Sequence, residues 1–218
     1  MSTPQIFWKR IFGTLLRPSG WEFSWRRRTD ELLKRFLDLA LGFVACVAFA
    51  VPLLIIALLV KLTSQGPALY WSNRVGRNNV IFSMPKLRTM RVGTQVVASH
   101  LLQNPDQCLT PIGGFLRKSS LDELPQLWCI LRGDMSVVGP RPALFNQHNL
   151  IQMRTEQGVH AIRPGLTGWA QINGRDELPI PEKVELDLYY VRHRSLAFDM
   201  KVIFLTILKV VRRDGITH

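Results

Sequence analysis

The residues with the clearest potential for chemistry are two adjacent acids, Asp122 and Glu123, within the segment 116–142. Basic residues surround them in the sequence, namely Arg117, Lys118, Arg132 and Arg141. The run Ser120-Leu-Asp-Glu123 also matches a capping box, in which a serine and a glutamate bond the free amides of a helix start. Pro125 suits a helix only near that start. Helix capping is therefore one interpretation of the pair.

The other interpretation is catalytic, because the same surroundings suit phosphoryl chemistry. A carboxylate at a helix N-terminus among cations is expected to have a lowered pKa and to stay ionised. An ionised Asp122 can attack phosphorus. Glu123, with Asp122, can hold Mg²⁺, which commonly takes one or two carboxylates plus phosphate oxygens. Successive side chains of an α-helix diverge by about 100°, so one acid can face the phosphorus and the other the metal.

A second cluster is the basic run that begins at Lys86. With Arg88 and Arg91 it holds three cations within six residues. Their charges and donor groups suit a diphosphate. The sequence contains neither a Walker A motif nor a Gly-x-Gly-x-x-Gly motif, so the common glycine-rich phosphate loops are excluded.

A third cluster is the glycine-rich segment 163–175, which predicts tight turns, close backbone approach and a short strand. Gln171, Asn173 and Arg175 can hydrogen-bond a nucleotide or a sugar. Trp169 can stack on a base, but packing in the core is the favoured role for an isolated tryptophan.

The candidate membrane segment is the 22-residue run Leu39–Val60, which carries no charge. Such a segment would hold the residues above at a membrane surface. As a straight helix it reaches ~33 Å, against a hydrocarbon core of ~30 Å. Pro52 interrupts the run, and both flanks are basic, which favours keeping both ends on the cytoplasmic side. These features predict a re-entrant helix that kinks and leaves on the face it entered. An ordinary kinked transmembrane helix is the alternative.

Two further segments have an interfacial composition. The first 35 residues mix tryptophan and phenylalanine with arginine, so they predict an interfacial leader, with a disordered basic tail as the alternative. The last predicted helix, 198–213, has a basic stripe and a broad apolar face. It can lie in the membrane interface or pack on its own domain.

Composition limits the class of protein. The chain has 218 residues, a formal charge of +12 and 47% hydrophobic residues, which excludes intrinsic disorder. Its three cysteines are far apart and its five histidines lack metal-ligand spacing, so neither a disulfide framework nor a histidine metal site is expected. The basic charge indicates phosphate-bearing or lipid partners, and no nucleic-acid-binding motif accompanies it.

The expected fold is α+β and mostly helical, in three parts. These are a leader (1–35), a re-entrant membrane helix (36–62) and a cytosolic catalytic domain with short strands (63–218). In the third part, strands are predicted at 68–71 and 80–83 with a loop at 73–79 between them, and helices at 121–131, 145–157 and 182–192.

Ordered motifs through about 180 residues resemble the bacterial sugar transferase family, the monotopic phosphoglycosyl transferases. They begin with Lys34-Arg35-x-x-Asp38 and the Pro52 segment and include Leu116 to Leu127. The other matching motifs are Gly66-Pro67, Arg74-Val-Gly-Arg77, Lys86-Leu-Arg-Thr-Met90, Gly133-Asp-Met-Ser136, Val138-Gly-Pro-Arg-Pro142, Arg163-Pro-Gly-Leu-Thr-Gly-Trp-Ala-Gln171, Asp187, Tyr190 and Asp199. Leu87, Met84-Pro85 and Cys129 depart from the common pattern.

This resemblance implies transfer of a sugar 1-phosphate from a UDP-sugar to polyprenyl phosphate with release of UMP, as the first membrane step of glycan assembly. In the family, the aspartate matching Asp122 forms a phosphosugar–aspartyl intermediate and the glutamate matching Glu123 helps to bind Mg²⁺. Substrate-binding positions are then expected at Lys86, Arg88, Arg117, Arg141, Gln171 and Arg175. The resemblance also implies a re-entrant helix and a location at the bacterial inner membrane, with the catalytic domain facing the cytoplasm.

The expected partners are thus the UDP-sugar, polyprenyl phosphate and membrane phospholipids, with a second copy of the chain as a further candidate. Two other functions use the same residues. A membrane-bound nucleotide-sugar hydrolase would release sugar phosphate to water without a lipid acceptor. A basic membrane adaptor would need neither acid. The sequence does not specify the sugar.

Overall fold

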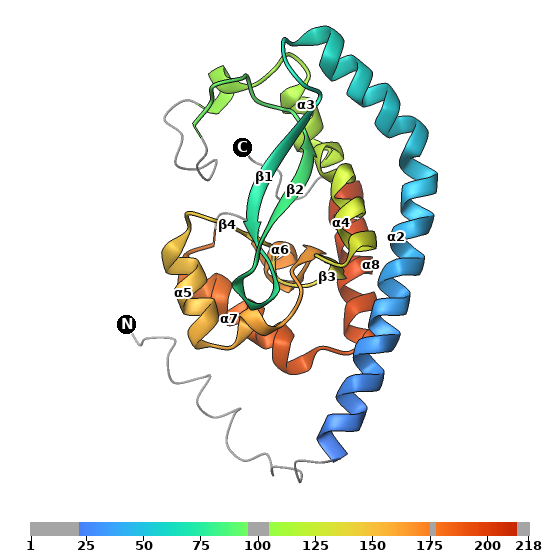
Figure 1. Cartoon of the computed structure of the whole chain (residues 1–218), viewed down its shortest axis with the longest axis vertical. Helices are drawn as coiled ribbons and strands as arrows, with labels where there is room; N and C mark the ends of the chain where they lie inside the picture. The colour runs from blue at the N-terminus through green and yellow to red at the C-terminus, as the bar shows by residue number, and fades with distance from the viewer. Residues whose placement is uncertain (1–21, 96–104, 175–177, 213–218) are drawn as a thin grey trace.

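The computed structural model describes residues 22–95, 105–174 and 178–212. Figure 1 shows a long helix along one side of a smaller α+β domain that is mostly helical, as expected. The elements in chain order are α2 (Glu22–Thr63), β1 (Leu69–Val75), η1 (Arg77–Asn79), β2 (Ile81–Leu87), η3 (Pro105–Cys108), α3 (Gly113–Lys118), η4 (Leu121–Gln126), α4 (Leu127–Arg132), β3 (Ser136–Val138), β4 (Ala143–Leu144), α5 (His148–Glu156), η5 (Val159–Ala161), β5 (Gly165–Thr167), α6 (Trp169–Asn173), α7 (Ile180–His193) and α8 (Leu196–Arg212).

Helix α2 is one continuous helix of 42 residues with Pro52 inside it. The structure does not divide this segment into two arms of a hairpin, so the re-entrant form stays a prediction. The helix also continues through the expected boundary between residues 35 and 36. The first 21 residues of the expected leader lie outside the described part of the chain.

The apolar part of α2 is exposed. Its stretch Asp30–Thr63 is long and apolar enough to cross a membrane, and its most apolar 18-residue window has a mean hydropathy of 3.0. Only 6% of that window is buried. A core helix of a soluble domain would be mostly buried, so this finding favours membrane association over a role in the core.

The strands β1 and β2 form an antiparallel hairpin in which Lys86 pairs with Tyr70. The expected loop at 73–79 is too long, because Asn73 to Val75 continue β1. The turn is shortened by Asn78 and Asn79, which both have positive φ, a conformation that asparagine tolerates. Strand β2 lies at the edge of the sheet, which accommodates a proline within it at position 85.

The segment with the two acids differs from the single helix expected at 121–131. It forms the 3₁₀-helix η4 and then the short α-helix α4. Ser120 has φ 56°, in the left-handed region, and its side chain makes no capping bond. The capping-box interpretation is therefore wrong. The Glu123 amide bonds only the Ser120 carbonyl, and the Glu123 side chain is used elsewhere.

The two short strands β3 and β5 pair in parallel and bring two glycine-containing segments into backbone contact. A Cβ at Gly165 would lie 2.1 Å from the Gly139 amide nitrogen, and one at Gly168 would lie 2.0 Å from the Gly139 carbonyl oxygen. These glycines therefore permit the close backbone approach predicted from the sequence. The backbone that approaches them is that of Gly139 in the same chain.

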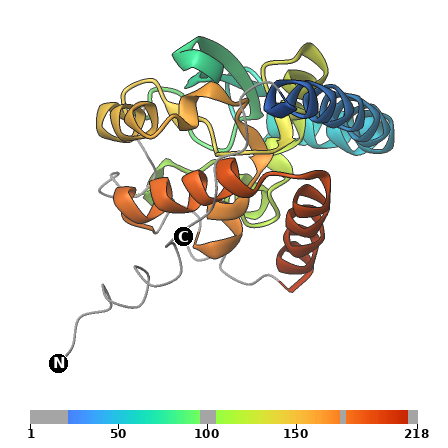
Figure 2. The same cartoon turned by 90° about the horizontal axis from the view of Figure 1, so that it is seen from below.

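The C-terminal half is helical where the sequence predicts it, since α5, α7 and α8 match the expected segments within a few residues. Helix α6 replaces part of the loop expected at 163–175. Trp169 packs against Tyr189 and Phe198, which confirms its predicted packing role. Seen from below, α2 and α8 lie at the same side of the molecule (Figure 2).

Candidate active site

Glu123 is at the centre of an ion-paired cluster contributed by three elements. Its Oε1 accepts hydrogen bonds from Lys86 Nζ of β2 at 2.8 Å and from Arg141 Nη2 of the β3–β4 loop at 2.7 Å. Burial alone would raise the pKa of Glu123, but the charges and hydrogen bonds of Arg141 and Lys86 hold it well below its usual range. Glu123 is thus ionised and fixed in position.

Asp122 is buried beside this cluster, with 7% of its surface exposed. Its carboxylate makes no hydrogen bond with any described residue, so both oxygens are free to react. The pKa of Asp122 is raised to about 6, chiefly by burial and also by the charge of Glu123, while Lys86, Arg141 and Arg117 oppose the rise. The expectation of a lowered pKa is therefore wrong, because desolvation outweighs the nearby cations.

The structure brings Lys86, Arg117 and Arg141 together around the two acids. Arg117 lies on α3, close enough to act on the charge of Asp122. Two predicted catalytic residues and three predicted phosphate-binding residues thus converge from β2, α3, η4 and the β3–β4 loop. A buried carboxylate surrounded by cations is suited to nucleophilic attack on a phosphorus atom that carries negative charge.

Arg88 does not join this cluster. Its guanidinium donates to the carbonyls of Ser64, Gln65 and Pro67, just beyond the end of α2, and to the Ser64 hydroxyl. Only 6% of its surface is exposed. Arg88 therefore holds the backbone just beyond the end of α2, and its predicted role as a phosphate ligand stays a prediction.

Gln171 lies on α6, which packs chiefly against α7 and α8. No hydrogen bond joins Gln171 to the acid cluster. Both polar atoms of its amide are buried without a hydrogen-bond partner. Leaving such atoms unpaired is unfavourable, which is consistent with a partner supplied from outside the chain. The predicted Arg175 lies outside the described residues.

The loop that carries Arg141 is held by residues whose roles sequence reasoning missed. Arg154 donates to the Arg141 carbonyl at 2.7 Å and pairs with Asp187 at 2.6 Å, where both side chains are buried. Arg74 donates to the Pro142 carbonyl at 3.1 Å. Arg74 and Asp187 both occur in the motifs that resemble the family, so the sequence did mark these positions. A motif does not reveal, however, which carbonyl group an arginine binds.

Helix α2 holds the other end of the same loop. Lys34 Nζ donates to the Val138 carbonyl at 3.1 Å and pairs with Asp199 at 2.6 Å. Asp38 accepts hydrogen bonds from the Ser136 hydroxyl at 3.0 Å and the Val137 amide at 2.9 Å. The motif Lys34-Arg35-x-x-Asp38 therefore joins α2 to β3, which ends three residues before Arg141.

Most of the chain that builds this site matches one known protein family. A profile described as Bacterial sugar transferase matches residues 29–213. The chain belongs to this family.

Three relatives show how far the similarity extends. The chain is 42% identical over 189 residues to a UDP-glucose:undecaprenyl-phosphate glucose-1-phosphate transferase of Escherichia coli, covering 83% of the chain and 40% of that protein. It is 34% identical over 191 residues to a UDP-N-acetylgalactosamine-undecaprenyl-phosphate N-acetylgalactosaminephosphotransferase of Aeromonas hydrophila, covering 84% and 44%. It is 40% identical over 189 residues to the uncharacterized sugar transferase EpsL of Bacillus subtilis, covering 85% and 90%.

The chain therefore spans less than half the length of most of these sugar transferases and nearly all of EpsL. The two relatives with named sugars differ in the sugar, although their identities to the chain are similar. Family membership alone therefore does not assign a sugar to the chain.

A metal ion would have to share the two acids of this sugar transferase site. No group of three or more histidine, cysteine, aspartate and glutamate side chains is arranged to hold a metal in the described part of the chain. Mg²⁺ needs only one or two carboxylates when phosphate oxygens and water complete its coordination. The free oxygens of Asp122 and the carboxylate of Glu123 fit that requirement once a diphosphate is present.

Proposed function

We propose that the chain transfers a sugar 1-phosphate from a UDP-sugar to polyprenyl phosphate, with UMP as the other product. The observation that carries this proposal is the unpaired, buried carboxylate of Asp122 beside a glutamate held by Lys86 and Arg141. The names of two relatives, each of which includes a UDP-sugar and undecaprenyl phosphate, support the same class of reaction. The step would begin the assembly of a surface polysaccharide or a related glycan.

In the first step, a carboxylate oxygen of Asp122 attacks the β-phosphorus of the UDP-sugar. The bond from that phosphorus to the bridging oxygen breaks, and UMP leaves with the bond's electron pair. The sugar phosphate is then joined to Asp122 as an acyl phosphate. In the second step, a phosphate oxygen of the polyprenyl phosphate attacks the same phosphorus and releases the carboxylate, which yields a polyprenyl diphosphate sugar.

The cations of the site bind and orient the phosphates in both steps. Lys86 and Arg141 hold Glu123 and present positive charge next to Asp122, and Arg117 adds charge from α3. Bound at Asp122 and Glu123, Mg²⁺ would supply further neutralisation of the diphosphate charge. Because positive charge lowers the pKa of a neighbouring carboxyl, donor binding would also favour the ionised form of Asp122.

We also propose that α2 enters the membrane from the cytoplasmic side and that both of its ends stay on that side. The support is that both ends contact the same domain. Lys34 and Asp38 bind β3 near one end, and Arg88 binds the chain just beyond the other end. A helix with ends on opposite faces of a bilayer could not make both sets of contacts. This is the re-entrant form expected for an inner-membrane enzyme.

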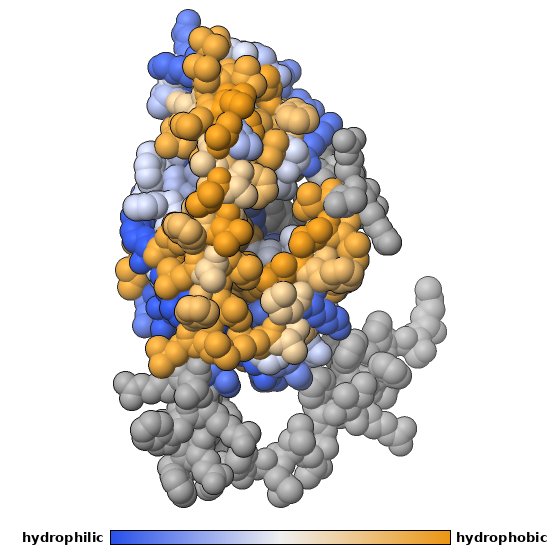
Figure 3. Space-filling view, turned by 90° about the vertical axis from the view of Figure 1, so that its right-hand side faces the viewer, coloured by the Kyte–Doolittle hydropathy of each residue, from blue (hydrophilic) through white to orange (hydrophobic). Residues whose placement is uncertain are grey.

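The apolar surface supports the same orientation. Figure 3 shows apolar side chains along α2 and, beside it, over α8. On α8 the exposed apolar side chains recur at helical spacing, namely Met200, Phe204, Ile207 and Val210. One face of the molecule thus combines two apolar helices, as expected for an enzyme that meets a lipid acceptor at the headgroup plane.

The test is an assay of UMP release by the purified chain in nanodiscs, with Mg²⁺ and a panel of UDP-sugars. We expect turnover with one or a few donors that requires undecaprenyl phosphate. Release of free sugar phosphate without the lipid would instead indicate a hydrolase. No release with any donor, at intact membrane binding, would favour the adaptor function.

A further inference from the structure

A second polar pocket lies beside the N-terminal part of α2, outside the acid cluster. Side chains from α2, η1, β3, α7 and the segment before β5 line it. Five lining side chains are cationic and two are acidic, namely Lys34, Arg35, Arg77, Arg163 and Arg194 against Glu31 and Asp38. None of them belongs to the cluster around Asp122. The pocket is therefore a separate concentration of positive charge that the proposed reaction does not use.

Two of the cations have roles within the fold. Lys34 pairs with Asp199 and binds β3, as described above. Arg35 donates to the carbonyls of Ile130 at 2.7 Å and Leu131 at 3.0 Å, at the C-terminal end of α4. A helix C-terminus favours a cation, so Arg35 is a structural contact there.

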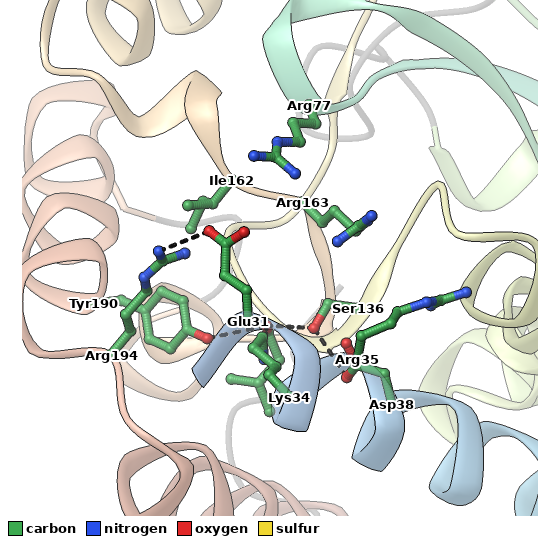
Figure 4. Close-up of a pocket in the computed structure, with 11 residues that line it drawn as sticks. Glu31, Lys34, Arg35, Asp38, Arg77, Ser136, Ile162, Arg163, Tyr190 and Arg194 are labelled. Carbon is green, nitrogen blue, oxygen red and sulfur yellow. Dashed lines mark hydrogen bonds and ion pairs between the residues drawn. The ribbon is translucent and has the colours of Figure 1, made fainter. Parts of the chain in front are cut away.

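The three remaining arginines have donor groups to spare. The Arg77 side chain is exposed and makes no hydrogen bond with any described residue. Arg163 uses its Nε for the Gly133 carbonyl at 2.9 Å, which leaves both terminal nitrogens. Arg194 pairs with the exposed Glu31 at 3.1 Å. In Figure 4 the side chains of Arg77 and Arg163 and the Glu31 carboxylate surround one opening.

The charges in this opening are unbalanced in the direction that attracts an anion. Burial lowers the pKa of Arg163, and its neighbours Arg77 and Arg35 lower it further, against the opposing effects of Asp38 and Glu31. A bound anion would relieve this repulsion. The planar, forked guanidinium groups are well matched to the oxygens of a phosphate.

The position of the pocket indicates which phosphate it meets. The uncharged run of α2 begins at Leu39, directly after Asp38, so the lining residues of α2 form its last charged turns before the apolar stretch. With that stretch in the hydrocarbon, these turns lie at the depth of the lipid headgroups. We propose that Arg77, Arg163 and Arg194 bind the phosphate of an anionic phospholipid headgroup. The phosphate competes there with the Glu31 carboxylate, which pairs with Arg194. This inference rests on the membrane association proposed above.

The test is a calorimetric titration of the full chain, in a neutral detergent, with short-chain phosphatidylglycerol. Short-chain phosphatidylcholine and inorganic phosphate are the comparison titrants. We expect saturable binding of phosphatidylglycerol and weaker binding of phosphatidylcholine, whose choline cation faces the arginines. A lost charged hydrogen bond corresponds to roughly tenfold or more in affinity, so Arg77→Gln and Arg163→Gln should each weaken binding by that factor.

Two further variants make the test specific. Arg192→Gln removes the same charge from an exposed position that does not line the pocket, and should leave binding unchanged. Glu31→Gln removes the competing carboxylate and should tighten binding, which a purely structural pocket would not do. Thermal midpoints check folding, and Arg77→Gln should leave the midpoint unchanged since its side chain bonds no described residue.

Three results would overturn the inference. They are no saturable binding of phosphatidylglycerol, equal binding by wild type and Arg77→Gln, and binding of inorganic phosphate as tight as that of the lipid. The last result would reassign the pocket to soluble phosphate. UMP release by the wild-type chain separates the two proposals. A wild-type chain that turns over normally but does not bind phosphatidylglycerol contradicts only the pocket, whereas a wild-type chain that binds the lipid but shows no turnover contradicts only the transferase.

Discussion

At the residue scale, the candidate site depends on the buried carboxylate of Asp122 beside Glu123, which Lys86 and Arg141 hold in place. Asp122, Glu123, Lys86, Arg117 and Arg141 converge as expected, because motif density selects residues of suitable chemistry. The expected direction of the pKa shift of Asp122 was wrong, since burial depends on the tertiary contacts of η4 and cannot be predicted from the neighbouring residues in the sequence. The site holds its free carboxylate at a cost in stability.

That cost predicts a pH-dependent effect of Asp122→Asn. The pKa of Asp122 is near 4 when unfolded and about 6 when folded, so between these values the folded state binds more protons and stability falls as pH rises. The neutral asparagine avoids this penalty. At pH 7 we expect a free energy of unfolding roughly 2 kcal/mol higher than that of wild type, with the difference vanishing by pH 4. Thermal midpoints across this pH range measure it, and a midpoint lowered at pH 7 would contradict the account.

The contrast between Arg88 and Arg141 gives a second prediction at this scale. Arg88→Lys loses the several carbonyl contacts beyond α2, so its thermal midpoint should fall by several degrees. Arg141→Lys removes the guanidinium that donates two hydrogen bonds to the Glu123 carboxylate. We therefore expect kcat/KM to fall roughly 10–100-fold, with a smaller change in the thermal midpoint. The two variants serve as controls for each other. If both variants changed activity and stability equally, the result would indicate that Arg88 also acts at the phosphate-binding site.

At the element scale, the long amphipathic or apolar helices were predictable and the short elements of the site were not. Helices α7 and α8 have a clear periodicity over many residues. The 3₁₀ turn η4 and the five-residue α6 depend on packing, which overrides so short a local pattern. The glycine-rich segment 163–175 was assigned the right property, close approach, while its partner strand could not be identified from the sequence.

The parallel contact between β3 and β5 predicts a sharp difference between two glycines. In Gly165→Ala the new methyl group would lie 2.1 Å from the Gly139 nitrogen, so the backbone must move and Arg141 with it. We expect a midpoint lowered by several degrees or more and a lower kcat. Gly114→Ala, in α3, is the matched control. Its new methyl group would meet only the Leu109 side chain, at an ordinary contact distance of 3.6 Å. Near-wild-type stability of Gly165→Ala would contradict this packing.

At the scale of the whole molecule, the domain that holds the candidate site packs against the long apolar helix α2. Composition indicated the apolar helix, the basic charge and the lipid partner. It could not indicate that Lys34 and Asp38 of α2 hold β3 and thereby the loop of Arg141, because these contacts join residues about a hundred positions apart. The position of the apolar helix α2 and the geometry of the site are thus linked by direct contacts.

The exposed apolar face of α8 predicts separable effects on membrane binding and folding. Phe204 and Ile207 are 60% and 57% exposed, so replacing both by serine should change the thermal midpoint little. Co-sedimentation with vesicles should nevertheless decrease, because apolar area buried in the interface is lost. Val202→Ser, at a fully buried position of the same helix, should instead destabilise the fold. Unchanged sedimentation of the double variant would show that α8 does not contact lipid.

The central claim, that Asp122 is the nucleophile, is tested most directly by intact-protein mass spectrometry. The chain is incubated with Mg²⁺ and its UDP-sugar donor in the absence of polyprenyl phosphate. We expect a mass gain of one sugar phosphate, located on Asp122 by peptide mapping, lost on addition of polyprenyl phosphate and missing in Asp122→Asn. An adduct on another residue, or normal UMP release by Asp122→Asn, would contradict it.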